Sequence, residues 1–184
     1  VVNLHIPASV EYIGDEVFAY NPLTSITVDP NNPYFDSRNN CNAIIVDDGG
    51  DYYLVQGSRI TVIPSDIIAI VPHAFEGVGL TSITIPNGVE YIGLSAFENN
   101  QLTSIHIPAS VAYMGGDLDE GEYNVFDNNP LTSITVDSNN PNYTSANSNV
   151  LIETSTNVLM QGSTNATIPN TVEAIGPYAF EGDD

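Results

Sequence analysis

The chain has 184 residues, 42% of them hydrophobic, and it carries 23 Asp and Glu against two Lys and Arg, for a formal net charge of -21. This charge argues against nucleic acid and anionic membranes as partners, because phosphate binding needs a basic surface that displaces counterions. No apolar run approaches the roughly 20 residues needed to span a bilayer, so we expect no membrane insertion in this chain.

The chain consists of repeats with a period of 22 residues. The phrase Leu-Thr-Ser-Ile recurs at Leu23, Leu80, Leu102 and Leu131, and Leu80 and Leu102 are 22 residues apart. Self-similarity at this period predicts a solenoid in which each coil buries its apolar residues against its neighbours. We expect seven units, which begin near Val1, Leu23, Ser58, Leu80, Leu102, Leu131 and Ser163.

Each unit opens with alternating apolar and polar residues, the period of a β-strand. In the fourth unit Ile83 and Ile85 are expected to point inward and Thr84 outward. We expect the strand of each coil to pair in parallel with the strand of the next coil. Proline cannot donate a ladder hydrogen bond, so the strands should end at a recurring proline. These prolines are Pro7, Pro64, Pro86, Pro108 and Pro169.

The rest of each unit is expected to line the far wall of the coil. Val89 and Ile92 have the spacing to face the core, and Gly93 suits a sharp corner. A phenylalanine then recurs at matching places, which predicts an aromatic column inside the solenoid. Its members are Phe18, Phe75, Phe97, Phe126 and Phe180.

Three units carry insertions, which must loop out of the coil. Short apolar runs at residues 43–46 and 52–55 flank a polar turn, as do residues 150–152 and 158–160. Each pair predicts a β-hairpin that replaces the phenylalanine segment. The third insertion, residues 116–122, is acidic and bounded by glycine, which predicts an exposed loop.

Two acidic clusters are candidates for cation binding: Asp47, Asp48 and Asp51 form one, and Asp117, Asp119, Glu120 and Glu122 form the other. Calcium takes six to eight oxygen ligands, and neither cluster matches the EF-hand loop or the RTX nonapeptide. Solubility through self-repulsion is the simpler interpretation. We therefore expect no cofactor, and Ca²⁺ is the alternative.

No catalytic or metal-binding pattern stands out among the reactive residues. Cys41 is the single cysteine, so no internal disulfide can form, and it suits a small buried position better than a nucleophile. His5 and His106 fill a repeat position that is threonine in other units, as at Thr27. The chain has no Gly-rich phosphate loop, no G-x-S-x-G elbow and no H-E-x-x-H. We expect a protein that is not an enzyme.

The stretch LTSITIPNGVEYIGLSAFENNQLTSIHIPASV resembles the bacterial leucine-rich repeats of the BspA type, also called the Treponema pallidum type. VDPNNPYFDSRNNCNAII, at residues 28–45, resembles an insertion common in that family. VDSNNPNYTSANSNVLIE, at residues 136–153, is a diverged copy in which Ser148 stands in place of Cys41. The resemblance supplies no catalytic residues.

The repeats and the resemblance together define the expected fold. It is an α/β-type repeat solenoid, mostly β, built as a right-handed leucine-rich-repeat superhelix with a parallel concave sheet. The convex segments are short helices or irregular, and the two β-hairpins are insertions. We expect a single domain over residues 1–184, with about seven coils. Neither end shows a polar cap, so we expect a part of a longer solenoid.

The outward residues of the strands form columns that we expect to bind a partner, because solenoids hold extended partners on such faces. The candidate residues are Ser82, Thr84, Ser104, His106, Ser133 and Thr135. The resemblance implies an extracellular or cell-surface adhesion module, whose partner would be a host or matrix protein. The alternatives are a passive structural spacer and a glycan-binding module, which exposed rings at Tyr12, Tyr91 and Tyr113 would favour.

Overall fold

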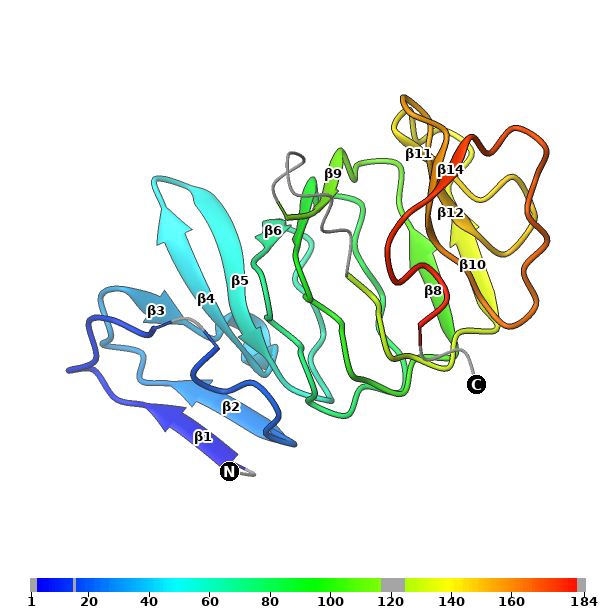
Figure 1. The fold of residues 1–184 in the computed structure, drawn as a ribbon. Coiled ribbons are helices and arrows are strands. Elements are labelled where there is room, and N and C mark those ends of the chain that lie inside the picture. The colour runs from blue at the N-terminus through cyan, green and yellow to red at the C-terminus, as the bar shows by residue number, and fades with distance from the viewer. Residues whose placement is uncertain (1–2, 15, 117–124, 182–184) are drawn as a thin grey trace.

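The computed structural model describes residues 3–14, 16–116 and 125–181. They form an elongated stack of coils, with the two ends of the chain at opposite ends of the stack (Figure 1). Almost all regular structure is β. The described residues contain one short 3-10 helix, η1 (Arg38–Asn40), and no α-helix. The far-wall segments that were predicted to be short helices or irregular consist instead of short strands and turns.

Parallel strand pairs form between the opening segments of two pairs of neighbouring units. β1 (Asn3–Ile6) pairs with β2 (Ser25–Val28), and β8 (Ser104–Ile107) pairs with β10 (Ser133–Val136), both in the register of the repeat. β1 and β8 end immediately before Pro7 and Pro108, as expected from the missing proline N–H. The predicted parallel pairing is confirmed for these two pairs.

The prediction that every coil pairs with the next on this wall is wrong, because residues 60–63, 82–85 and 165–168 are not in strands. The third coil bonds to the preceding insertion instead of to β2. The Val62 N–H donates to the Cys41 carbonyl at 3.1 Å, and in the last coil the Thr167 N–H donates to the Ser148 carbonyl at 3.0 Å. An insertion therefore interrupts the strand wall of the coil that follows it.

The opposite wall carries the more continuous sheet. In the six-stranded sheet β3, β4 and β5 are antiparallel, and β5, β6, β7 and β9 run in parallel. Its strands are β3 (Phe35–Asp36), β4 (Ala43–Asp48), β5 (Asp51–Gly57), β6 (Ile67–Ile70), β7 (Tyr91–Gly93) and β9 (Tyr113–Gly115). A four-stranded sheet follows, with β11 (Tyr143–Thr144), β12 (Leu151–Glu153), β13 (Val158–Gln161) and β14 (Ala174–Ile175).

An antiparallel strand pair lies at each predicted hairpin. β4 and β5 are joined by Gly49 and Gly50, whose φ values of 68° and 104° favour glycine. The Gly50 N–H donates to Asp47 Oδ1 at 2.8 Å, so this carboxylate takes part in the turn. β12 and β13 form the second pair. The β4–β5 pair projects from the stack (Figure 1).

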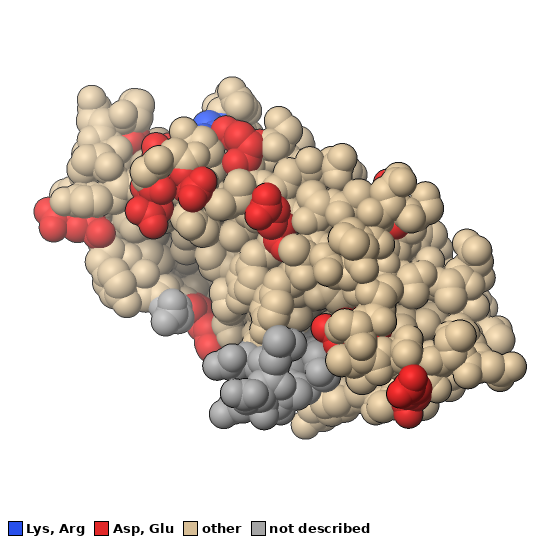
Figure 2. Space-filling view, turned by 90° about the horizontal axis from the view of Figure 1, so that it is seen from above, with Lys and Arg blue, Asp and Glu red and all other residues tan. Residues whose placement is uncertain are grey.

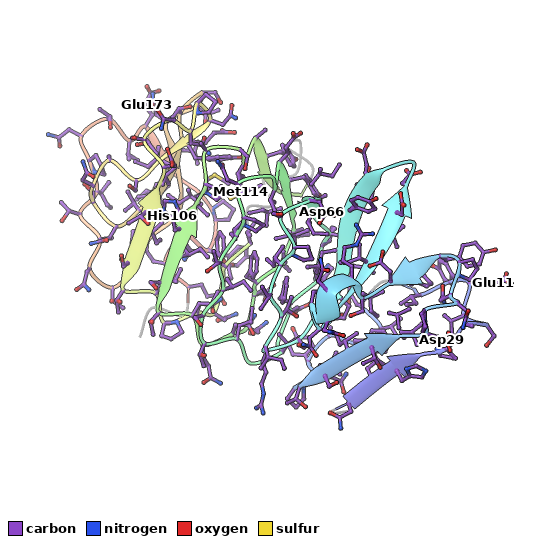
Figure 3. All side chains as sticks on the ribbon, turned by 180° about the vertical axis from the view of Figure 1, so that it is seen from behind. Glu11, Asp29, Asp66, His106, Met114 and Glu173 are labelled. Carbon is purple, nitrogen blue, oxygen red and sulfur yellow. The ribbon has the colours of Figure 1, made fainter. Side chains whose placement is uncertain are left out.

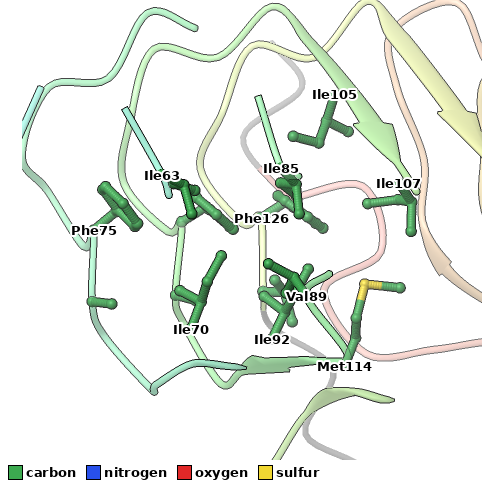
Figure 4. Close-up of a cluster of buried hydrophobic side chains, with 14 of the residues drawn as sticks. Ile63, Ile70, Phe75, Ile85, Val89, Ile92, Ile105, Ile107, Met114 and Phe126 are labelled. Carbon is green, nitrogen blue, oxygen red and sulfur yellow. The ribbon is translucent and has the colours of Figure 1, made fainter. Parts of the chain in front are cut away.

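The core lies between the two walls, and the repeat positions predicted to face it are buried (Figure 4). Val89, Ile92 and Phe97 have no exposed surface. The rings of Phe75 and Phe97 stack with centroids 5.2 Å apart, and Phe126 continues the stack at 5.5 Å. At about 25 cal/mol per Å² of apolar surface removed from water, such columns are a main favourable term of folding.

The aromatic column is shorter than predicted. Phe18 is half-buried and Phe180 is 40% exposed, because the second and sixth units lack a phenylalanine at this place. Glycines occupy the space instead. A Cβ added at Gly57 would lie 1.9 Å from the Phe75 ring, and one added at Gly162 would lie 2.0 Å from the Phe180 ring. The glycine at the end of each hairpin therefore leaves the space that the phenylalanine ring of the next coil occupies.

Candidate protein-binding face

Four of the six predicted site residues lie together on β8 and β10. Ser104 is opposite Ser133, and His106 is opposite Thr135. The outward residues are exposed or half-buried, while Ile105 and Ile134 between them are buried, so strand alternation fixes the direction of every side chain. We call these four outward residues the β8–β10 patch.

One cross-strand contact orders the β8–β10 patch. His106 Nδ1 lies 3.0 Å from Thr135 Oγ1, and the Thr135 hydroxyl is also 3.4 Å from the Ile105 carbonyl. His106 stands on the outer surface of the sheet (Figure 3). Because its Nδ1 faces the threonine, the Nε2 edge of the imidazole points to solvent and can donate to or accept from a partner.

A second patch of the same design lies at the other end of the stack, on β1 and β2. His5 Nδ1 is 3.0 Å from Thr27 Oγ1, and the Thr24 hydroxyl donates to Asn3 Oδ1 at 3.2 Å. These residues were not among the six candidates. Their signal was present in the sequence, since His5 and Thr27 fill the same repeat position as His106 and Thr135.

A carboxylate follows the end of the second strand in each patch. Asp29 accepts hydrogen bonds from the backbone N–H of Asn31 at 2.8 Å and from its side chain at 3.0 Å, and these bonds lower the pKa of Asp29. Asp137 accepts the same two bonds from Asn139, with the same lowering of its pKa. Both carboxylates are therefore charged at neutral pH.

Ser82 and Thr84 are exposed on the same wall, but they lie on a segment that does not pair with β8. A hollow of about 260 Å³ separates this segment from the third coil. The candidate site is therefore not one broad sheet. It consists of two ordered strand pairs with an interrupted stretch between them.

Cys41 and His73 lie away from this face. Cys41 is buried, with Sγ 3.9 Å from Ser37 Oγ, and burial raises the pKa of its thiol, which reduces the thiolate needed for nucleophilic attack. His73 Nδ1 is 2.8 Å from the buried carboxylate of Glu76, and its Nε2 is 3.4 Å from Glu16. This contact joins the turns of the first and third coils.

The predicted cation clusters are tested only in part. No group of three His, Cys, Asp or Glu residues is placed to hold a metal within residues 3–14, 16–116 and 125–181. Asp117, Asp119, Glu120 and Glu122 lie outside those ranges. The visible carboxylates are scattered, with an Arg beside one group (Figure 2).

The tyrosines that would favour glycan binding differ in exposure. Tyr12 is 80% exposed, whereas Tyr91 and Tyr113 are half-buried and stack on each other with centroids 5.5 Å apart. Stacked rings present a face to each other rather than to a sugar, so this pair adds little to the glycan alternative. No helix among the described residues has the length and apolar character to cross a membrane.

A family model described as the BspA type leucine rich repeat region matches residues 1–44 and 59–183, in six copies. The unmatched stretch, 45–58, contains most of the first hairpin. The family model therefore covers the repeats that build both patches. No curated protein matches the chain.

Three solved structures are similar. A leucine-rich repeat protein from Eubacterium ventriosum is 24% identical over 73% of this chain and 36% of its own, with a TM-score of 0.58. The pneumococcal vaccine antigen PcpA is 18% identical over 99% of this chain and 43% of its own, with a TM-score of 0.62. A leucine rich cell surface protein from Faecalibacterium prausnitzii is 21% identical over 75% and 48%, with a TM-score of 0.46. The chain matches less than half the length of each.

Proposed function

This chain belongs to the BspA-type leucine-rich repeat family, and we propose from that premise that it is a protein-interaction module of the cell surface. Its partner is an extracellular protein of the host or matrix, which it binds through the outward residues of the strand wall. The module acts by binding alone, without catalysis. The sequence pattern and the family both favour this function over chemistry at a single site.

The observation that carries the proposal is the order of the exposed polar residues. In the β8–β10 patch, hydroxyls and an imidazole stand in register above a buried apolar layer. Side chains fixed in this way lose little entropy on binding, which leaves more of the contact energy for affinity. A passive spacer has no need for such an ordered face, and the β1–β2 patch repeats it.

A binding screen tests the proposal. The purified chain is measured against extracellular-matrix proteins, host-cell surface proteins and a glycan panel, at physiological and raised salt. We expect a saturable protein partner whose affinity falls at least about tenfold in the double variant Thr84→Glu/His106→Glu, because two carboxylates then replace a hydroxyl and an imidazole on the face. The melting temperature of the variant should match that of the native chain.

The matched control is Ser155→Glu/Asn170→Glu, which adds two carboxylates at exposed turn positions outside the six candidate residues and the hollow. Equal loss of binding in both double variants would mean that net charge, not the face, decides the interaction. A folded chain that binds no protein in the screen would favour the spacer, and binding to glycans alone would favour the glycan-binding alternative.

A further inference from the structure

One stretch of the strand wall has the side-chain pattern of a strand but no strand partner. Along residues 82–85, Ser82 and Thr84 are exposed, Ile83 is half-buried and Ile85 is buried. No residue in the described part of the chain hydrogen-bonds to the backbone of these four residues. An extended segment with open N–H and C=O groups is a template for adding another strand.

The coil beside this stretch differs from all the others in its outward residues. Ile60 is 53% exposed and Val62 is 74% exposed. In the other six units the same two positions hold Ser, Thr, Asn or His, as at Ser82 and Thr84. Exposed apolar side chains therefore lie beside the open backbone of residues 82–85.

A hollow connects these two features. It has a volume of about 260 Å³ and is lined by residues 61–63, residues 82–84 and Pro86. On the opposite wall the same two coils are joined, because β6 pairs with β7 and the His73 N–H donates to the Leu94 carbonyl at 3.0 Å. The two coils are thus joined on one wall and separated by the hollow on the other wall. The hollow therefore follows from the way the coils stack.

We propose that this hollow is a docking groove for one extended segment of the partner protein, which adds as a β-strand along residues 82–85. The inference rests on the proposed function and specifies how the partner is held. Backbone hydrogen bonds would supply affinity, and Ile60 and Val62 would select apolar side chains. The net charge of -21 and the two cations of the chain favour a segment flanked by Lys or Arg.

A peptide of alternating threonine and valine flanked by lysines tests the groove by fluorescence anisotropy with the intact chain. We expect saturable binding. The same peptide with alternate N-methylated backbone amides should bind at least about tenfold more weakly, because it lacks the donors of a strand. This comparison leaves the protein unchanged, so a failure of folding cannot produce it.

A protein variant locates the binding. Ile60→Ser/Val62→Thr restores the residues found in other coils and should weaken peptide binding about tenfold, whereas Ile175→Ser, which removes an exposed apolar side chain on β14, should leave it unchanged. Equal binding of both peptides, or no effect of the double variant, overturns the groove. So does self-association of the chain through this edge in sedimentation. A protein partner that depends on His106 but not on Ile60 and Val62 overturns the groove and leaves the proposed function standing.

Discussion

The two long units of the chain, residues 23–57 and 131–162, have the same skeleton but different local contacts. In each, one asparagine side chain reaches back to the preceding coil. Asn32 donates to the Pro7 and Val10 carbonyls, and Asn140 donates to the equivalent carbonyls of the coil before it, each at 2.8–3.0 Å. Each unit also ends in Gln-Gly, at Gln56 and Gln161, and a serine begins the next unit.

The first long unit has contacts that the second lacks. Arg38 forms ion pairs with Asp36 and Asp66 and lies 3.6 Å above the centre of the Tyr52 ring. Ala146 stands at its place in the second unit. The hairpin and its attachment are the same in both, so the asparagine and glycine positions maintain the architecture, and the ion pairs add to it locally.

The two long units should differ most in the stability lost when their terminal glycines are substituted. Gly57→Ala forces a methyl group against Phe75, which is fully buried in the aromatic stack, and should lower the free energy of unfolding by about 3 kcal/mol. The methyl group of Gly162→Ala would contact Phe180, which is 40% exposed and can move aside. We therefore expect the free energy of unfolding to fall by only about 1 kcal/mol. Urea denaturation of both variants measures the difference, and equal losses would contradict this explanation.

A smaller difference in stability is expected from the buried serine hydroxyl that follows each long unit. Thr61 Oγ1 accepts from the Ser58 N–H at 2.7 Å and lies 3.3 Å from the Ser58 hydroxyl. In the coil that follows the second long unit Ala166 stands at this place, and the buried Ser163 hydroxyl has no hydrogen-bond partner among the described residues. Thr61→Ala should therefore cost about 2 kcal/mol, and Ala166→Thr should add about 1 kcal/mol.

Valine provides the control for this pair of substitutions, because it has the shape of threonine without the hydroxyl. Thr61→Val should destabilise nearly as much as Thr61→Ala, and Ala166→Val should not reproduce the gain of Ala166→Thr. Thermal unfolding of the four variants gives the comparison. A gain from Ala166→Val equal to that from Ala166→Thr would assign the effect to packing instead of to the Ser163 hydroxyl.

The smallest expected effect on stability, with a clear chemical readout, is at Cys41 and Ser148. Cys41 is 3% exposed, and burial raises the pKa of its thiol, so the thiolate fraction at pH 8 is low and rises only as the pH approaches that raised pKa. Ser148 is half-buried. In Cys41→Ser/Ser148→Cys, alkylation by iodoacetamide should be about tenfold faster than in the native chain. Both proteins should react equally in urea.

Much of the core could be predicted from the period alone. Val89, Ile92 and Phe97 are fully buried because the repeat places apolar side chains at the same depth in the central coils. The breaks in the strand wall could not be predicted in this way. Those at residues 60–63 and 165–168 depend on where the Cys41 and Ser148 carbonyls lie after the insertions fold, and the sequence of one repeat does not contain that information.

The candidate site, like the core, could be predicted only in part from the sequence. The alternation of β8 and β10 placed Ser104, His106, Ser133 and Thr135 on one surface, as the repeat indicated. The separation of Ser82 and Thr84 from them was not predictable, because it follows from the spacing of whole coils. The apolar residues Ile60 and Val62 at the outward positions of the third coil could be seen in the sequence. Their proposed role in binding depends on the hollow beside them, which the sequence does not show.

The hydrogen bonds between coils have a mechanical consequence. Strands in a solenoid run across the stack, so the bonds that join one coil to the next lie roughly along its length. Those from His73 to Leu94 and from Phe97 to Val125 are examples. Tension applied at the two ends would load such bonds in line and peel the coils off one at a time, so the stack would lengthen in steps and absorb force without breaking all at once.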